Sequence, residues 1–232
     1  MRISWKQRRT RSLGLVIFLT LLLGIASTQA ARNDSSGTKT ILVFGDSLSD
    51  GLFLSRSEAY PALLIPKLKA AGLSYEVINA SQSGGTTEEG IARLPPHLRH
   101  RIDIFVLELG INDAFRGTPI DKIRDNLQSL IDTVRAKNPE VRVVIAGMQW
   151  PNHSGDDYVE AFGQMYVDLA QKNHAALIPY LLEGVSGHPD LNLPDGLHPN
   201  AAGHRILAEN VWRVLGPVAR EVSGKAGASA GR

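Results

Sequence analysis

The chain has 232 residues, enough for one domain with a sizeable core, and it contains no cysteine. Disulfides, thiolate nucleophiles and cysteine metal sites are therefore excluded. Of its 25 basic and 23 acidic residues, residues 1–30 hold five basic and no acidic ones. The rest of the chain has no basic run that would favour a nucleic-acid partner.

The first 30 residues have the pattern of a secretory signal peptide. A basic start is followed by an apolar run over residues 13–26, and Thr28-Gln29-Ala30 resembles a small-residue cleavage signal. The run is shorter than a typical membrane-spanning helix. We expect cleavage between Ala30 and Ala31, export to the periplasm or beyond, and no membrane span in the mature protein. An uncleaved signal anchor is the alternative.

Short apolar segments alternate with amphipathic ones through the rest of the chain. We expect strands at residues 40–45, 75–78, 104–109, 141–146 and 176–178. We expect helices at residues 58–71, from residue 86 or 87 to Pro95-Pro96, from residues 118–119 through Val134, at 158–173 and at 200–215. Pro66 should break or kink the first of these helices.

This alternation indicates a three-layer α/β/α domain with a five-stranded parallel sheet over residues 40–216. Right-handed crossovers leave few topologies, and we expect the flavodoxin-like strand order 2-1-3-4-5. That order would bring together the ends of the first three strands. Residues 31–39 are expected to form a flexible spacer, and residues 217–232 a disordered tail.

Ser47 directly follows a buried strand, in the segment Gly45-Asp46-Ser47-Leu48-Ser49. Ligands of open α/β sheets bind outside the carboxyl ends of the strands, so Ser47 is a candidate nucleophile. A serine hydroxyl needs a base that takes its proton. Asp195 and His198, three residues apart in a turn, could supply an orienting carboxylate and that base. Alternatively, Asp195 only caps the turn and His198 is an exposed loop histidine.

Gly84 and Asn112 are candidate donors to an oxyanion. Gly84 has no side chain, so its N–H can approach a ligand closely, and Asn112 offers an amide donor at a strand end. Each could instead be an ordinary turn former. Asp46 should orient the loop around the nucleophile. Ser229 lies in a G-x-S-x-G match, but no strand precedes it and no acid or histidine follows, so we interpret that match as chance.

Taken together, Gly45-Asp46-Ser47-Leu48-Ser49, Gly84, Asn112 and Asp195-x-x-His198-Pro199 resemble the four blocks of the SGNH, or GDSL, hydrolase superfamily. The similarity covers about residues 40–216. Segments such as Asn79-Ala80-Ser81-Gln82-Ser83-Gly84 and Leu107-Glu108-Leu109-Gly110 are similar to the secreted acyl-CoA thioesterase I, arylesterase and lysophospholipase L1 group.

The resemblance implies a mechanism and a substrate class. Ser47 would be the nucleophile and His198 the base, oriented by Asp195. The N–H groups of Ser47 and Gly84 and the side chain of Asn112 would bind the oxyanion. The protein would be a secreted serine hydrolase of small acyl esters and thioesters, acyl-CoA and lysophospholipids, working through an acyl-enzyme on Ser47 without a metal or cofactor.

Two departures leave the acyl-chain preference open. Ile111 and Gly85 stand where many members of that group carry Gly and Asp, and residues 149–155 are altered in a region that shapes the acyl pocket. A carbohydrate O-acetyl esterase, which Trp150 and Asn152 would suit, is one alternative. A flavodoxin-like binding module whose serine only hydrogen-bonds a ligand is the other.

Overall fold

The computed structural model describes residues 37–150 and 157–224. Several sequence expectations lie outside these residues: the signal peptide with its cleavage site at Ala30/Ala31, the spacer before residue 37, Asn152 of the altered loop, and the part of the tail after residue 224, which contains Ser229. Within the described ranges, no helix is both long and apolar enough to cross a bilayer.

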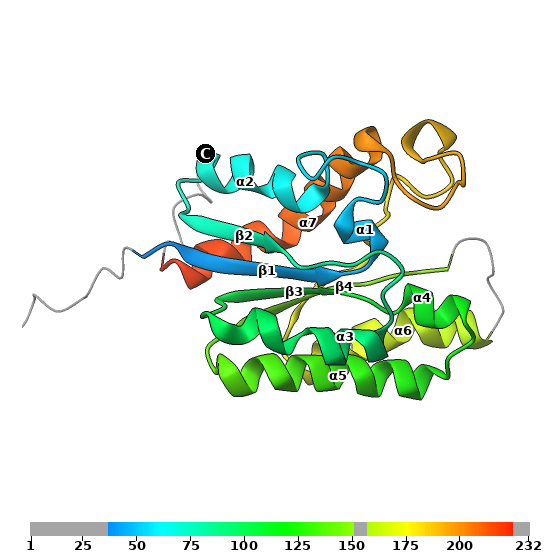
Figure 1. Ribbon diagram of the computed structural model, residues 1–232, viewed down its shortest axis with the longest axis horizontal. Coiled ribbons are helices and arrows are strands. Elements are labelled where there is room, and N and C mark those ends of the chain that lie inside the picture. The colour runs from blue at the N-terminus through cyan, green and yellow to red at the C-terminus, as the bar shows by residue number, and fades with distance from the viewer. Residues whose placement is uncertain (1–36, 151–156, 225–232) are drawn as a thin grey trace, which may run out of the picture. The chain divides into compact units, whose positions relative to one another are not determined.

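Five parallel strands form one sheet in the order β2-β1-β3-β4-β5, which confirms the predicted topology. The strands are β1 Lys39–Gly45, β2 Tyr75–Asn79, β3 Ile104–Glu108, β4 Arg142–Ala146 and β5 Ala176–Ile178. Every residue of β3 is buried, because helices cover both faces of the sheet (Figure 1). This double burial explains the continuous apolar runs from which the strands were predicted.

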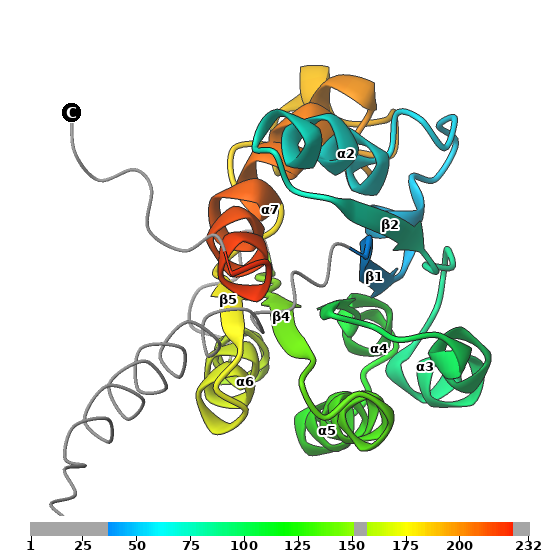
Figure 2. The same ribbon diagram turned by 90° about the vertical axis from the view of Figure 1, so that its left-hand side faces the viewer.

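The helices form the two outer layers (Figures 1 and 2). On one face lie α2 Tyr60–Ala70 and α7 Ala201–Val222, and on the other lie α3 Thr87–Arg93, α5 Ile120–Lys137 and α6 Asp157–Lys172. Two short helices were not predicted: α1 Ser47–Asp50 begins just after β1, and α4 Ile111–Phe115 begins just after β3. Both therefore start at the carboxyl edge of the sheet.

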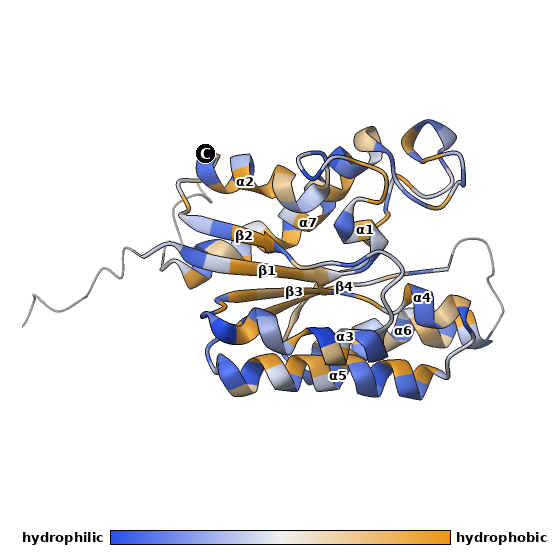
Figure 3. Ribbon diagram, in the orientation of Figure 1, coloured by the Kyte–Doolittle hydropathy of each residue, from blue (hydrophilic) through white to orange (hydrophobic). Residues whose placement is uncertain are grey.

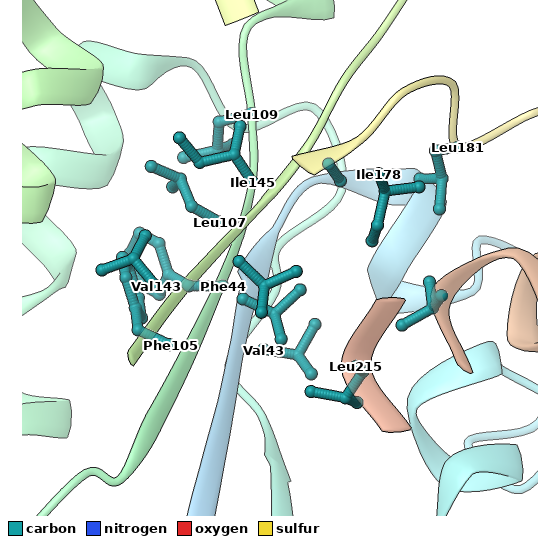
Figure 4. Close-up of a cluster of buried hydrophobic side chains, with 14 of the residues drawn as sticks. Val43, Phe44, Phe105, Leu107, Leu109, Val143, Ile145, Ile178, Leu181 and Leu215 are labelled. Carbon is teal, nitrogen blue, oxygen red and sulfur yellow. The ribbon is translucent and has the colours of Figure 1, made fainter. Parts of the chain in front are cut away.

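The core is built from apolar side chains on both faces of the strands. In Figure 4, Phe44, Phe105 and Leu107 point to one side of the sheet, while Val43, Ile178 and Leu215 gather on the other. Hydropathy follows the same layers, with apolar strands inside and polar outer helix surfaces (Figure 3). Burying one such side chain stabilises the fold by about 1.5–3 kcal/mol, so the sheet is a rigid support for the loops at its edge.

Two sequence expectations need correction. Of the break or kink expected at Pro66, the break does not occur: α2 is continuous, the Pro66 ring is exposed, and Leu64 and Leu68 on either side of it are buried and hold the helix on the core. The last helix does not end at residue 215, since α7 continues to Val222. Residues 217–222 are therefore helical rather than part of a disordered tail, and the burial of Val218 and Ala219 explains why.

Candidate active site

The carboxyl ends of β1, β2 and β3 bring the predicted segments together. Ser47 is the first residue of α1, Gly84 lies in the loop after β2, and Asn112 is in α4, directly after β3. His198 comes just before Asn200, whose side chain caps α7 by accepting from the N–H groups of Ala202 and Gly203. The imidazole of His198 is thus held by a segment that is fixed at the start of the last helix.

Ser47, His198 and Asp195 form a continuous hydrogen-bonded chain. Ser47 Oγ lies 2.9 Å from Nε2 of His198, and Nδ1 of the same ring lies 2.7 Å from Oδ2 of Asp195. With its proton on Nδ1, the neutral imidazole donates to the carboxylate and leaves Nε2 free to accept from the hydroxyl. This is the arrangement that activates a serine hydroxyl.

The carboxylate of Asp195 also caps its own turn. Its Oδ1 accepts from the N–H groups of Leu197, at 2.9 Å, and His198, at 3.0 Å. The two sequence interpretations of Asp195 are therefore compatible, because one oxygen caps the turn and the other holds the imidazole. Burial would raise the pKa of Asp195, but the hydrogen bonds from the N–H groups of His198 and Leu197 and from the imidazole outweigh it and lower the pKa to about 2. The group is ionised at neutral pH.

Two backbone N–H groups in the segments after β1 and β2 have no protein acceptor among the described residues. Within the part of the chain that the structure describes, the N–H groups of Ser47 and Gly84 donate to no acceptor. For Ser47 this follows from its place in the first turn of α1, where helix N–H groups lack an internal partner. Gly84 has φ of +76°, and no atom lies within 4 Å of the position a Cβ would take, so its surroundings are open.

The amide of Asn112 differs from this pair because it is already engaged. Its Nδ2 donates to Oδ2 of Asp46 and to the carbonyl oxygen of Gly85, each at 3.1 Å. An oxyanion bound here would have to share one of these hydrogens. The structure thus brings Asn112 to the site that the sequence predicted, and it adds two protein partners that the sequence did not show.

Asp46 is fully buried and connects the nucleophile loop to Asn112. Its Oδ1 accepts from the N–H of Leu48 at 3.0 Å, which caps α1, while Oδ2 accepts from Asn112. The expectation that Asp46 orients the loop agrees with the first contact. The second contact gives the same carboxyl group a further role, because it fixes the direction of the Asn112 amide.

Beneath Asp46 lies a second buried acid, Glu108, which sequence reasoning missed as a site residue. Its Oε2 accepts from the N–H of Asp46 at 3.1 Å and from the Ser49 hydroxyl at 2.7 Å. A Cβ on Gly45 would lie 2.4 Å from this oxygen, so only glycine leaves room for the carboxyl group. The available signal was an acidic residue at the end of an otherwise apolar strand.

Burial dominates the titration of both acids. It raises the pKa of Asp46 to about 7, against the lowering effect of the Leu48 N–H and of the charges on His198 and Arg93. It also raises the pKa of Glu108 well above the usual range, and repulsion from Asp46 adds to the effect. Burial thus disfavours the charged form of Glu108, which lies beneath the Ser47 loop.

A cavity of about 280 Å³ opens beside Ser47 and His198. Its lining is mostly apolar, with side chains that include Leu48, Ile111, Phe115, Met148, Trp150, Leu182 and Leu197. The rings of Phe115 and Trp150 meet edge to face, with centroids 4.8 Å apart. A larger cavity of about 380 Å³ near Leu98 and Val141 has no serine in its described lining, and its His100 and Glu140 are not hydrogen-bonded to each other, so the smaller cavity is the candidate site.

Comparison with known proteins agrees with this geometry. Residues 43–206 match the GDSL-like lipase/acylhydrolase family. Esterase TesA of Pseudomonas aeruginosa is 38% identical over 199 residues, which is 85% of this chain and 98% of the relative. Thioesterase 1/protease 1/lysophospholipase L1 of Escherichia coli is 35% identical over 199 residues, covering 85% of this chain and 91% of the relative. The crystal structure of TesA matches with a TM-score of 0.73 at 40% identity and covers 78% of this chain and 99% of that one.

The chain therefore belongs to the GDSL-like lipase/acylhydrolase family. It is an enzyme, a hydrolase of the esterase type, and both the predicted family and the predicted fold are confirmed. Within the described residues, no group of three or more His, Asp or Glu side chains is placed to hold a metal ion.

We predict that Glu108→Gln changes how stability depends on pH. A carboxyl group whose pKa is raised by folding stabilises the folded state at low pH, and this contribution is lost as the pH rises from the unfolded pKa near ~4.3 through the folded value. Glutamine does not titrate. Relative to wild type, the variant should therefore gain free energy of unfolding as the pH rises from 5 to 8.

Urea unfolding at both pH values measures this difference. Glu76→Gln, at an exposed position of β2, is the matched control and should show no such gain. Parallel pH profiles for wild type and Glu108→Gln would contradict the prediction.

Proposed function

We propose that this protein is a secreted serine hydrolase that cleaves carboxylic esters and thioesters through an acyl-enzyme on Ser47. The observation that carries the proposal is the hydrogen-bonded chain from Ser47 through His198 to Asp195, beside a mostly apolar cavity. The family membership supports the reaction class, and the names of the two relatives, an esterase and a thioesterase/lysophospholipase, support esters, thioesters and lysophospholipids as substrates.

In the acylation step, Ser47 Oγ attacks the acyl carbonyl carbon while His198 Nε2 takes the hydroxyl proton. The imidazolium then gives this proton to the leaving oxygen or sulfur, whose bond to the acyl carbon breaks. In the second step, water attacks the Ser47 ester, His198 takes a proton from the water, and the proton returns to Oγ as the carboxylic acid leaves. Asp195 stays ionised throughout and stabilises the imidazolium.

The oxyanion of each tetrahedral intermediate would be bound by three donors: the N–H groups of Ser47 and Gly84 and the Asn112 amide. Such donors act by being fixed in place before charge develops. Asp46 contributes to this by holding the Asn112 amide at 3.1 Å. In this scheme, Asp46 and Glu108 are supports and do not transfer protons.

The cavity favours an acyl chain over a sugar as the bound group. A carbohydrate O-acetyl esterase must satisfy many hydroxyl groups, and outside the catalytic residues the described lining offers few polar side chains, such as Gln149 and Ser186. A binding module is a further alternative, but it has no need of a serine held 2.9 Å from an imidazole nitrogen. A fluorophosphonate probe separates the classes, because it labels only an activated serine.

We predict that the three proposed catalytic residues act as one unit. Ser47→Ala and His198→Ala should each lower kcat by about 10⁴–10⁶, and the double variant should be scarcely worse than either single variant. Asp195→Ala should be milder, because His198 keeps its proton-accepting nitrogen but loses its orientation. Hydrolysis of p-nitrophenyl esters by folded variants measures these effects.

Ser229→Ala, in the chance G-x-S-x-G match, is the control and should behave as wild type. The fluorophosphonate probe should label wild type and Ser229→Ala but not Ser47→Ala. Substantial turnover by Ser47→Ala, or multiplicative losses in the double variant, would mean that another residue is the nucleophile.

We also predict that Asn112→Ala lowers kcat by about 10²–10³ with little change in KM, since an oxyanion donor acts in the transition state. Steady-state kinetics on the folded variant provides the measurement. An unchanged kcat would limit Asn112 to its structural contacts with Asp46 and Gly85.

Export is the remaining part of the proposal, and it comes from the sequence alone. We predict that the protein recovered outside the cytoplasm begins at Ala31, because Thr28-Gln29-Ala30 supplies small residues where a signal peptidase cuts. N-terminal sequencing decides this, and an exported protein that begins at Met1 would indicate an uncleaved anchor instead.

A further inference from the structure

Arg93, at the end of α3, joins the ends of two strands through its guanidinium group. Nη1 donates to the carbonyl oxygen of Ala80 at 2.5 Å, and Nη2 donates to that of Gly45 at 2.6 Å. The guanidinium carbon lies 3.8 Å from the centre of the Phe44 ring, so the planar group is also stacked. One side chain thus makes three contacts with β1 and with the segment after β2.

The two carbonyl acceptors stand just before the two proposed oxyanion donors. Gly45 is two residues before Ser47, and Ala80 is four residues before Gly84. Backbone hydrogen bonds also join the segment after β2 to the end of β1: Ala80 N–H donates to the Val43 oxygen at 2.9 Å, and Gln82 N–H donates to the Gly45 oxygen at 3.1 Å. The separation of the Ser47 and Gly84 N–H groups therefore depends on how these strand ends are held.

The chemistry of this position requires arginine. Within the described residues, no carboxylate lies within ion-pair distance of Arg93, and Asp46 and Glu108 attract it only from further away. The half-buried cation is therefore bound by two carbonyl oxygens and an aromatic ring, while its buried Nε has no hydrogen-bond partner among the described residues. A guanidinium can bind two carbonyls and stack at the same time because it is planar, whereas an ammonium is a single point charge.

We propose that Arg93 is a positioning residue of the oxyanion site, setting kcat by fixing the spacing between the N–H groups of Ser47 and Gly84. This inference rests on the proposed function, in which those two groups bind the oxyanion. Arg93 would not touch the substrate. Its effect should therefore appear in the transition state and leave ground-state binding unchanged.

Arg93→Lys keeps the charge and loses the planar fork. We expect kcat for p-nitrophenyl ester hydrolysis to fall by about tenfold to a hundredfold, the size of effect that a small misplacement of a catalytic group produces. KM should stay nearly constant.

Two further measurements support the comparison. End-point titration with a fluorophosphonate gives the concentration of reactive Ser47 in each preparation, so that kcat is calculated per active enzyme. The affinity for an acyl trifluoromethyl ketone, whose adduct places an oxyanion in the same site, should fall by the same factor as kcat/KM.

Arg135→Lys is the matched control. Arg135 also uses both guanidinium nitrogens to join two helices, donating to Oδ1 of Asn173 at 2.8 Å and to its carbonyl oxygen at 2.5 Å, but it lies on α5, outside the site. This variant should lose stability without losing kcat. An equal fall of kcat in Arg135→Lys, an unchanged kcat in Arg93→Lys, or a rise in KM alone would overturn the inference.

Two further variants keep the result interpretable. If Arg93→Lys does not fold, Phe44→Leu removes the ring under the guanidinium and should lower kcat with steady KM, and an unchanged kcat would again overturn the inference. Ser47→Ala separates the two proposals. If Ser47→Ala is inactive and Arg93→Lys is fully active, only the role of Arg93 is refuted. If Ser47→Ala is active, the proposed function itself is refuted.

Discussion

The position of Ser47, the proposed nucleophile, depends on one buried carboxyl group at the end of β3. Glu108 Oε2 binds the Asp46 N–H and the Ser49 hydroxyl, which come before and after Ser47. Because a Cβ at Gly45 would meet this oxygen, the glycine is required by the acid and not by the turn alone. Burying two acids at the edge of the core is unfavourable, and the raised pKa of each shows this cost. The apolar sheet below must supply the compensating stability.

The sheet and its long helices were predictable because each of these elements had its own signal in the sequence, whereas the short helices α1 and α4 had none. The strands are runs of apolar residues, and α5 has a clear helical repeat with Ile123, Leu127 and Val134 buried as expected. The two wrong predictions, a break at Pro66 and an end of the last helix at residue 215, have their cause in tertiary packing. Pro66 is accommodated because neighbouring leucines hold α2 on the sheet, and α7 extends to Val222 because Val218 and Ala219 find room in the core. Neither effect is visible in a local pattern.

The site was predictable in part. Ser47, His198 and Asp195 were assigned from strand ends, a turn and the family resemblance, and the structure brings all three into contact. The support around them was not predictable, because Glu108, Arg93 and the Asp46–Asn112 bond join residues that only the strand order makes neighbours. Sequence spacing describes contacts within a turn well, as for Asp195 and His198. Residues that meet at the ends of different strands have no fixed separation along the chain, so sequence spacing does not predict their contacts.

Ser47 and His198 are separated by 151 residues, and this distance along the chain has a consequence for folding. A contact that closes so large a loop forms late in folding, because the chain loses conformational entropy on closing the loop before the contact can contribute free energy. A chain folding from its N-terminus would hold an unactivated hydroxyl until β5 and the start of α7 had docked. Under the proposed mechanism, the onset of catalysis would then report the completion of folding.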